Sequence, residues 1–251
     1  MGKLIGPPLT DAVVKFISTQ HLFFVASAPL SAGNHVNVSP KSAGMFRVIN
    51  PQQVTYLDYT GSGAETAAHL LENGRLTIMF VALQGSPRIV RLFGTGRIVL
   101  PRDLFNKPEN RNLREAFGYT SMDDWPTKDG ARCLVVLDIT RATVSCGFSI
   151  PVFEFVKDRK TLLEYAHQTD IEKYCLEQNS LSIDGMRSLG QLITRDVPTK
   201  ITEKQGWLLS EYGGSGPRAA LARLVTRIRM AYAAGITGPK RDIILLFTGI
   251  A

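Results

Sequence analysis

Three polar side chains alternate along one short segment in the first quarter of the chain. Asn37, Ser39 and Lys41 occupy every second position of the sequence HVNVSPK. In a β-strand all three leave the same face, because successive side chains point to opposite sides. An amide, a hydroxyl and a cation on one face fit the polar edge of a ligand. They equally fit a strand edge that faces solvent.

A glycine-rich turn, GSGAET at residues 61–66, precedes the one clear helix in the first half of the chain. Glycines before a helix leave backbone N–H groups and the positive end of the helix dipole open to a phosphate. Ser62, Glu65 and Thr66 add polar side chains at this entrance. The turn lacks the third glycine of a dinucleotide fingerprint, so a Rossmann domain is not expected. An ordinary helix cap is the alternative interpretation.

Further cations follow this helix. Asn73, Gly74 and Arg75 stand at its end, where Arg75 can hold a phosphate through two parallel hydrogen bonds or interact with the helix dipole. Arg88 and Arg91 both lie in the predicted strand over residues 88–100, on opposite faces of it. At most one of them, Arg91 or Arg88, therefore joins the same site unless a bulge intervenes.

Metal-based and nucleophilic chemistry are not predicted. Cys133, Cys146 and Cys175 form no CxxC pair, and the four histidines stand far apart. This spacing predicts that the protein has neither a disulfide framework nor a metal site. It also favours a reducing compartment for the protein. Cys146 is interpreted as a buried small residue of a strand, with a redox role as the alternative. No Ser-His-Asp or Cys-His grouping can be argued.

The composition is that of a globular protein. The 251 residues are 44% hydrophobic and 20% charged, and 29 basic against 22 acidic residues give a net charge of +7. This excess favours anionic partners in general. Nucleic-acid binding is not expected, because the basic residues are scattered and lack interleaved aromatic residues. The sequence shows neither a secretory signal nor an apolar run long enough to span a membrane.

The elements that would position these residues are mostly strands up to about Val156. Short turns separate the predicted strands, and a polar, helical excursion over residues 102–127 interrupts them. From Asp158 onwards helical periodicity dominates, with amphipathic segments at 160–168 and 171–178. The predicted strands cover residues 22–28, 35–39, 45–49, 54–59, 76–83, 88–100, 131–139 and 143–148.

The order of these segments resembles one known family. An apolar strand, VNVSPK, YLDYTGSGAET, a helix, NGR and RLFGTGRIV follow one another as in the pyridoxamine 5'-phosphate oxidase-like family of FMN-binding split barrels. The resemblance covers roughly residues 10–156. The segments SCGFSIP (145–151) and NSLSIDG (179–185) resemble an uncharacterised branch of that family.

The resemblance implies a mainly β fold, a six-stranded antiparallel split β-barrel with peripheral helices and a helical C-terminal extension. The barrel domain would comprise residues 1–156 and the extension residues 157–251. The chain would form a cytoplasmic homodimer with two FMN molecules at the subunit interface. The cofactor-binding residues implied by position are Asn37, Ser39, Lys41, Ser62, Glu65, Thr66, Asn73, Arg75 and Arg91 (or Arg88).

The implied function is an FMN-dependent oxidoreductase acting on an unidentified small organic substrate. The flavin carries the chemistry, while Lys41 is the candidate cation beside its ring. A flavin- or haem-binding protein without turnover is the alternative, and a deazaflavin remains open as cofactor. The C-terminus GPKRDIILLFTGIA does not align with the segment that holds the substrate phosphate in true pyridoxamine phosphate oxidases. Oxidation of pyridoxamine phosphate is therefore not expected.

The last third of the chain carries two further predictions. A basic amphipathic helix over residues 218–229, followed by Lys240, Arg241 and an apolar ending, predicts a packing helix or an interfacial one on a membrane surface. A membrane anchor beyond Ala251 is the alternative. Trp207 is predicted either to stack on a flavin of the partner chain or to pack in the interior.

Overall fold

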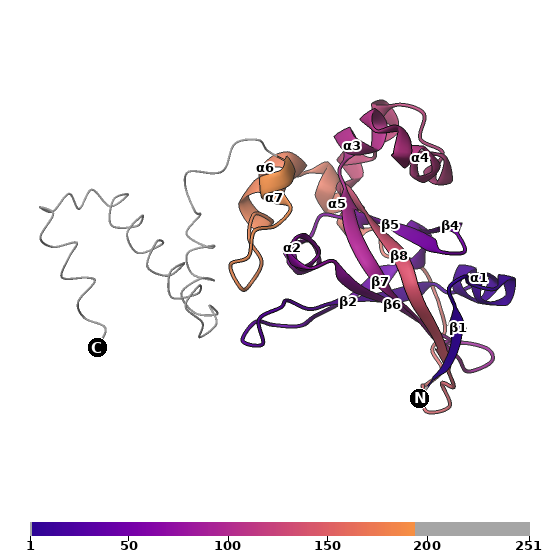
Figure 1. The fold of residues 1–251 in the computed structure, drawn as a ribbon. Helices are drawn as coiled ribbons and strands as arrows, with labels where there is room; N and C mark the ends of the chain where they lie inside the picture. Colours follow the sequence, from indigo (N-terminus) through magenta and orange to yellow (C-terminus); the bar gives the residue numbers. More distant parts are fainter. Residues whose placement is uncertain (1, 194–251) are drawn as a thin grey trace, which may run out of the picture.

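The computed structural model describes residues 2–193, which form a curled antiparallel sheet with helices around it (Figure 1). The strands are β1 (Lys3–Gly6), β2 (Leu22–Ser27), β3 (Asn37–Ser42), β4 (Phe46–Asn50), β5 (Gln53–Tyr59), β6 (Arg75–Val81), β7 (Ile89–Val99) and β8 (Ala131–Ser145). The α-helices are α1 (Asp11–Ser18), α2 (Glu65–Glu72), α3 (Pro101–Asn106), α4 (Arg111–Phe117), α5 (Thr161–His167), α6 (Ile171–Gln178) and α7 (Gly190–Ile193). The 3-10 turns are η1 (Ala43–Met45), η2 (Pro108–Asn110), η3 (Met122–Asp124) and η4 (Thr127–Asp129).

The sheet has the strand order β3-β2-β6-β7-β8-β5-β4, and β1 pairs with the far end of β8. All of these pairs are antiparallel. Strand β3 lies at one edge, which explains how Pro40 is tolerated there: an edge strand has backbone groups that need no partner. The expected split barrel is confirmed, with eight strands in the part of the chain that is described rather than six.

Strand β8 differs from its prediction. Two strands were expected over residues 131–139 and 143–148, and the structure has one strand of 15 residues instead. A bulge allows this continuity, since the register shifts between Phe93 and Gly94 of β7, which pair with Arg141 and Ile139. The extra residue, Thr140, bends β8 without ending it. Strand β1 has no counterpart among the predicted strands.

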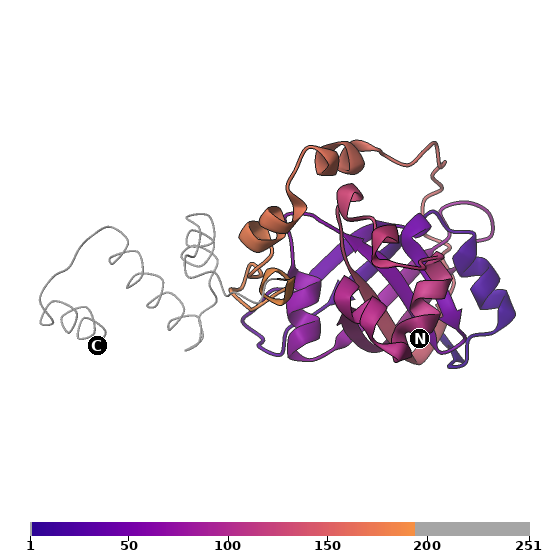
Figure 2. The ribbon, with the colours of Figure 1, turned by 90° about the horizontal axis from the view of Figure 1, so that it is seen from above.

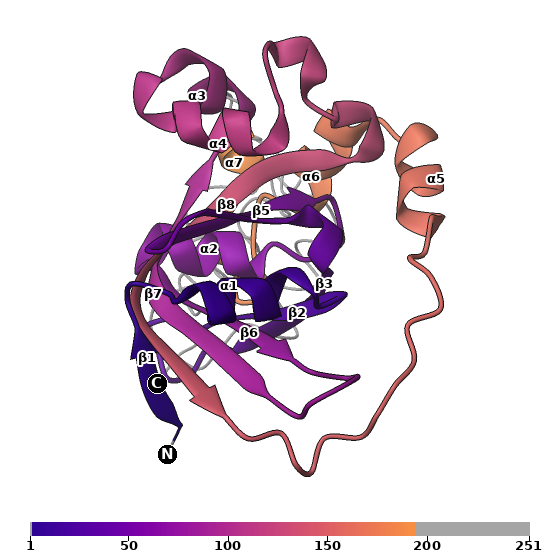
Figure 3. The ribbon, with the colours of Figure 1, turned by 90° about the vertical axis from the view of Figure 1, so that its right-hand side faces the viewer.

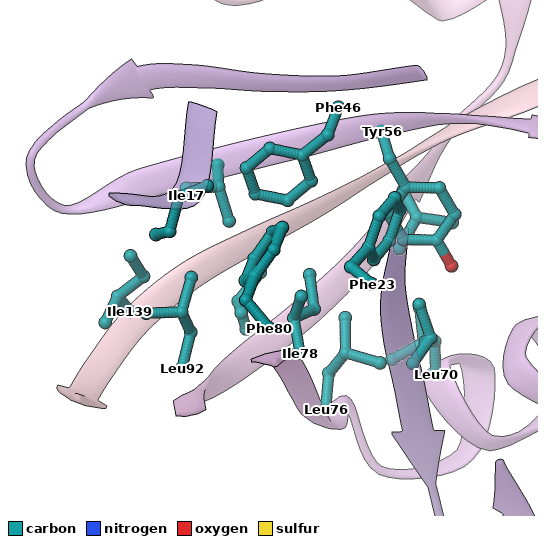
Figure 4. Packing of buried hydrophobic residues seen from close by; sticks show 14 of the residues in the cluster. Ile17, Phe23, Phe46, Tyr56, Leu70, Leu76, Ile78, Phe80, Leu92 and Ile139 are labelled. Atoms are coloured by element: carbon teal, nitrogen blue, oxygen red, sulfur yellow. The ribbon is translucent and has the colours of Figure 1, made fainter. Parts of the chain in front are cut away.

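The main core fills the inside of the curled sheet (Figure 4). Figure 1 shows α1 and α2 on opposite sides of the barrel strands, and both contribute to this core, through Ile17 and Leu70 respectively. A second cluster lies between β5 and β8 and the helices α3 and α4. Strands β5 and β8 are therefore covered on both faces, which accounts for the unbroken apolar run CLVVL in β8.

The connection after β8 is long and extended. Residues 151–160 contain no helix or strand, and Figures 2 and 3 show this segment running from β8 to α5. The predicted helices at 160–168 and 171–178 are confirmed as α5 and α6. The interpretation of Cys146 as a buried residue was wrong: β8 ends at Ser145, and the Cys146 side chain is exposed.

Some predictions fall outside the described residues. These are Trp207, the basic helix over 218–229, Lys240 with Arg241, and the apolar ending. Among residues 2–193, no helix is both long enough and apolar enough to cross a membrane.

Candidate functional site

The alternating side chains of β3 lie on the inward face of the sheet. Ser39 is paired with Val25 of β2 and Lys41 with Phe23, and both partners are completely buried. Because directly paired residues share a face, Ser39 and Lys41 are directed to the barrel side. The interpretation of this row as a solvent-facing strand edge is therefore not supported.

A hydrogen-bond network connects this row to the start of α2. Asn37 Nδ2 donates to Thr66 Oγ1 at 2.9 Å, and Ser39 Oγ donates to Asn37 Oδ1 at 3.1 Å. Behind them, Ser27 Oγ lies 2.9 Å from Nδ1 of the fully buried His69. Three of the predicted site residues, Asn37, Ser39 and Thr66, are thus brought together on two elements.

This network gives a first prediction. Replacing Thr66 with Val keeps the shape of the side chain and removes the acceptor of the Asn37 amide. We expect the free energy of unfolding to fall by about 1 kcal/mol, the usual net value of one hydrogen bond. Urea denaturation measures it, with the exposed Thr161→Val as the matched control. Equal stability of both variants would contradict the role given to Thr66.

Lys41 belongs to a buried ion network. Its Nζ lies 2.7 Å from Asp58 Oδ1, and the other carboxylate oxygen accepts from Arg132 Nε at 2.8 Å. The Asp58 and Arg132 side chains are only 7% and 6% exposed. Burial alone would raise the pKa of Asp58, but the charges of Arg132 and Lys41 outweigh it and lower that pKa to about 2. Two cations thus share one ionised carboxylate.

A later part of the chain, residues 179–190, covers the start of α2, and we refer to it as the covering segment. Asn179 Oδ1 accepts from Arg132 Nη1 at 2.8 Å, and the Asn179 amide donates to the carbonyl of Gly61. Ser188 Oγ donates to the carbonyl of Ala64 at 2.7 Å. The covering segment therefore holds the glycine-rich turn in place through side-chain contacts.

The covering segment also reaches the connection between β2 and β3. Asp184 accepts from the backbone N–H of His35 at 2.9 Å, and its other oxygen lies 2.7 Å from His35 Nδ1. Ile183 N donates to Glu65 Oε1 at 3.3 Å. The covering segment thus joins the loop before β3 to the first turn of α2.

The N-terminus of α2 keeps backbone donors available. Its N-cap is Ala64, which offers no side-chain acceptor to the first turn. Ser62 is exposed just before it, whereas the Glu65 carboxylate bends back towards Gly63. An anion approaching this helix end meets N–H groups and hydroxyls, with one carboxylate beside them.

The remaining predicted residues lie elsewhere. Asn73 Nδ2 and Arg75 Nη2 donate to the backbone carbonyl of Ala28, and Arg75 Nη2 also reaches Pro29 O at 2.8 Å. They tie the chain after β2 to the end of α2. Gly74 ends this helix with φ +69°, as predicted.

Arg91 of β7 and Arg88, which lies just before this strand, do not meet the β3 row either. Arg91 is paired with Met79, which stands in line with Pro40, so Arg91 lies on the face opposite to Lys41. Its Nη1 donates to Ser145 Oγ at 3.4 Å, whereas Arg88 stacks on the Phe16 ring. The structure thus separates both from the inward row.

A cavity of about 830 Å³ adjoins Lys41, between the β2 and β3 strands and the extended segment before α5. The segment is held across it by Phe153 N, which donates to Leu83 O, and by Asp158, which accepts from Ser42 Oγ. The rings of His21 and Phe155 stack 3.8 Å apart in its wall. Its volume lies within the range of about 300 to 1,000 Å³ of small-molecule sites.

Sequence reasoning missed Asp58, Arg132 and Asn179. A signal was present for the first two, because Asp58 interrupts the apolar strand VTYLDY and Arg132 opens the apolar strand ARCLVV. A charged residue inside a buried strand is expected to be paired. Asn179 gave no such signal, since its contacts lie 47 and 118 positions away along the chain.

Comparison with known proteins identifies the family. A family model described as pyridoxamine 5'-phosphate oxidase matches residues 9–146. The chain belongs to the pyridoxamine 5'-phosphate oxidase family. It is 37% identical over 199 residues to the pyridoxamine 5'-phosphate oxidase family protein ustO of Aspergillus flavus, a match that covers 72% of this chain and 76% of that protein.

Three solved structures are more distantly similar to this chain. A putative pyridoxamine 5'-phosphate oxidase from Listeria innocua is 7% identical, with a TM-score of 0.36 and coverage of 53% of this chain and 95% of that one. A related FMN-binding protein from Nostoc punctiforme is 11% identical, with a TM-score of 0.36 and coverage of 55% and 85%. HupZ of Group A Streptococcus is 17% identical, with a TM-score of 0.38 and coverage of 53% and 92%.

Proposed function

We propose that this protein binds FMN and acts as an FMN-dependent oxidoreductase on a small organic substrate. The observation that carries the proposal is the position of Lys41, which lies between the buried Asp58 carboxylate and an 830 Å³ cavity in a member of this family. A quarter of the Lys41 side chain is exposed, so the cation is held from behind and remains accessible.

The residues present fit the cofactor. FMN offers a polar ring edge, a ribityl chain with hydroxyls and a phosphate with two negative charges. The inward row supplies Asn37, Ser39 and Lys41, of which Lys41 lines the 830 Å³ cavity. The start of α2, which has no side-chain cap, would supply N–H groups together with Ser62 and Thr66. A helix N-terminus and a nearby cation are the usual partners of a phosphate. Glu65, Asn73, Arg75 and Arg91 stay predictions as cofactor ligands.

When bound, FMN supplies the hydride or electron transfer, and the chain provides binding and electrostatics. Lys41 would hold a positive charge beside the ring, where it would stabilise added negative charge on the ring. Asp58 fixes the position of Lys41 through the 2.7 Å contact, and Arg132 fixes Asp58 from the other side. The extended segment with Phe155 forms one wall of the cavity.

We further propose that the protein forms a homodimer through the outer face of β3. Val38 of β3 and Val36, just before this strand, are 61% and 71% exposed, and exposed apolar groups of this kind mark interaction surfaces. The division of the chain into a barrel domain (1–156) and a C-terminal extension (157–251) is a separate proposal. Sedimentation equilibrium of the full chain tests the dimer.

Substitution of Lys41 tests the proposed function. We expect Lys41→Met to weaken FMN binding about tenfold, because one charge-assisted contact to the cofactor is lost. Titration of FMN fluorescence measures the dissociation constant. The control is Lys15→Met, which removes an exposed lysine of α1. Unchanged FMN affinity in Lys41→Met would contradict the assigned site, provided that the variant melts as a folded protein.

A further inference from the structure

A second cavity lies on the other side of the ion network. It has a volume of about 330 Å³ and is lined by residues at the start of α3, in and after η3, at the start of β8, and in α6. Its walls are mostly apolar and include Leu100, Trp125 and Ile171, while Arg102, Arg132 and Glu172 contribute charges. Lys41 and the residues of β3 do not line this cavity, so it is separate from the proposed flavin site.

Arg132 has donors to spare at this cavity. Its Nε–H binds Asp58, and its Nη1 hydrogens bind the carbonyl of Gly63 at 3.1 Å and Asn179 Oδ1 at 2.8 Å. Within residues 2–193, the remaining nitrogen, Nη2, makes no hydrogen bond. A guanidinium carries five N–H groups, and the side chain of Arg132 is only 6% exposed. Nη2 is not one of the buried side-chain atoms that lack a partner, so its two N–H groups reach accessible space and can take an added acceptor.

The charge balance points to the same class of ligand. Asp58 is shared by Lys41 and Arg132, so one positive charge of this buried network is not neutralised. This net charge of +1 favours an anionic ligand over a neutral one beside Arg132. Arg102 and Glu172 also line the cavity and are both exposed, and their opposite charges cancel in the charge balance.

We propose that this cavity binds a small organic acid, with its carboxylate on Arg132 Nη2 and an aromatic or branched aliphatic body against Trp125 and Ile171. The volume is at the lower end for small-molecule sites, which favours a compact ligand over a nucleotide. The apolar walls favour an organic acid over inorganic phosphate. The site stands independently of flavin binding.

Fluorescence quenching tests the site in the full-length chain. The chain has two tryptophans, so Trp207→Phe leaves Trp125 as the sole reporter beside the cavity. Benzoate is the probe, and benzyl alcohol is its neutral counterpart of similar shape. We expect saturable quenching by benzoate with a dissociation constant about tenfold below that of benzyl alcohol, because a charged hydrogen bond is stronger than a neutral one.

Substitutions of exposed residues distinguish an anion-binding site from a purely apolar cavity, and they leave the buried core unchanged. Glu172→Gln is expected to tighten benzoate binding about threefold and Arg102→Gln to weaken it about threefold, as for partly screened charges. Neither substitution changes binding of benzyl alcohol. Lys173→Gln, an exposed neighbour that does not line the cavity, leaves both probes unaffected.

Three results would overturn the proposal. They are equal affinity for benzoate and benzyl alcohol, absence of quenching by millimolar benzoate, and benzoate affinities that do not change in Glu172→Gln and Arg102→Gln. Arg132→Met adds a direct test in which benzoate binding is lost. If that variant fails to fold, the two exposed variants still decide the question.

Discussion

Asp58→Asn is expected to lower the free energy of unfolding by about 3 kcal/mol. The substitution removes the carboxylate from between Lys41 and Arg132 and leaves two cations side by side, one of them only 6% exposed. Breaking a buried pair from one side typically costs about 3 to 5 kcal/mol, and partial exposure of Lys41 favours the lower end. Urea denaturation at neutral pH measures the loss.

The matched control for this variant is Asp123→Asn. Asp123 is exposed in η3, and we expect its substitution to stay within about 0.5 kcal/mol of the native protein. A loss below about 1 kcal/mol in Asp58→Asn would show that the ion network contributes little.

The pH dependence of the free energy of unfolding reports on the same ion pairs of Asp58. The pKa of Asp58 lies at about 2 in the folded chain against 3.8 ordinarily, so its contribution is fully present above about pH 4. It is lost as the pH falls towards 2, and the shift corresponds to about 2 kcal/mol. The stability difference between the native protein and Asp58→Asn should therefore narrow over this interval.

Phe23→Ala is expected to lower the free energy of unfolding by about 4 kcal/mol. Phe23 is completely buried, and its ring lies 5.2 Å from Phe46, 5.4 Å from Tyr56 and 5.6 Å from Phe80 between centroids (Figure 4). Removing the ring leaves a cavity among these aromatic residues. Phe→Ala substitutions in protein cores typically cost about 3 to 5 kcal/mol.

This substitution also reaches the candidate site. The Nζ of Lys41 lies 5.9 Å from the centre of the Tyr56 ring, which packs against Phe23. We therefore expect FMN binding to weaken along with stability. The control is Phe148→Ala, because Phe148 is 83% exposed and its loss leaves no cavity. Similar melting temperatures of the two variants would contradict the role of Phe23 in the core.

Much of the fold could be predicted from local patterns. The alternation in HVNVSPK placed Ser39 and Lys41 on one face, and Gly74 marked the end of α2. These features depend on neighbours in the sequence. The bulge at Thr140 does not, because a bulge depends on how two strands pair, and β8 was therefore divided into two strands.

The candidate site was less predictable, because it depends on register and on distant contacts. The alternation along β7 shows which residues share a face with Arg91. Whether that face is also the face of Lys41 depends on the pairing across four strands. The bonds of Asn179 to Arg132 and to Gly61 join segments far apart in the chain. The hydrophobic periodicity and the composition of the sequence do not predict such contacts.

The absorbance spectrum of the purified protein, recorded after incubation with FMN and desalting, tests the central claim most directly. The proposal predicts a retained flavin spectrum that dithionite bleaches and air restores. A colourless protein that does not retain FMN would contradict the assignment of an FMN-dependent oxidoreductase. A Soret band in the protein as isolated would contradict it as well and identify a haem-binding protein instead.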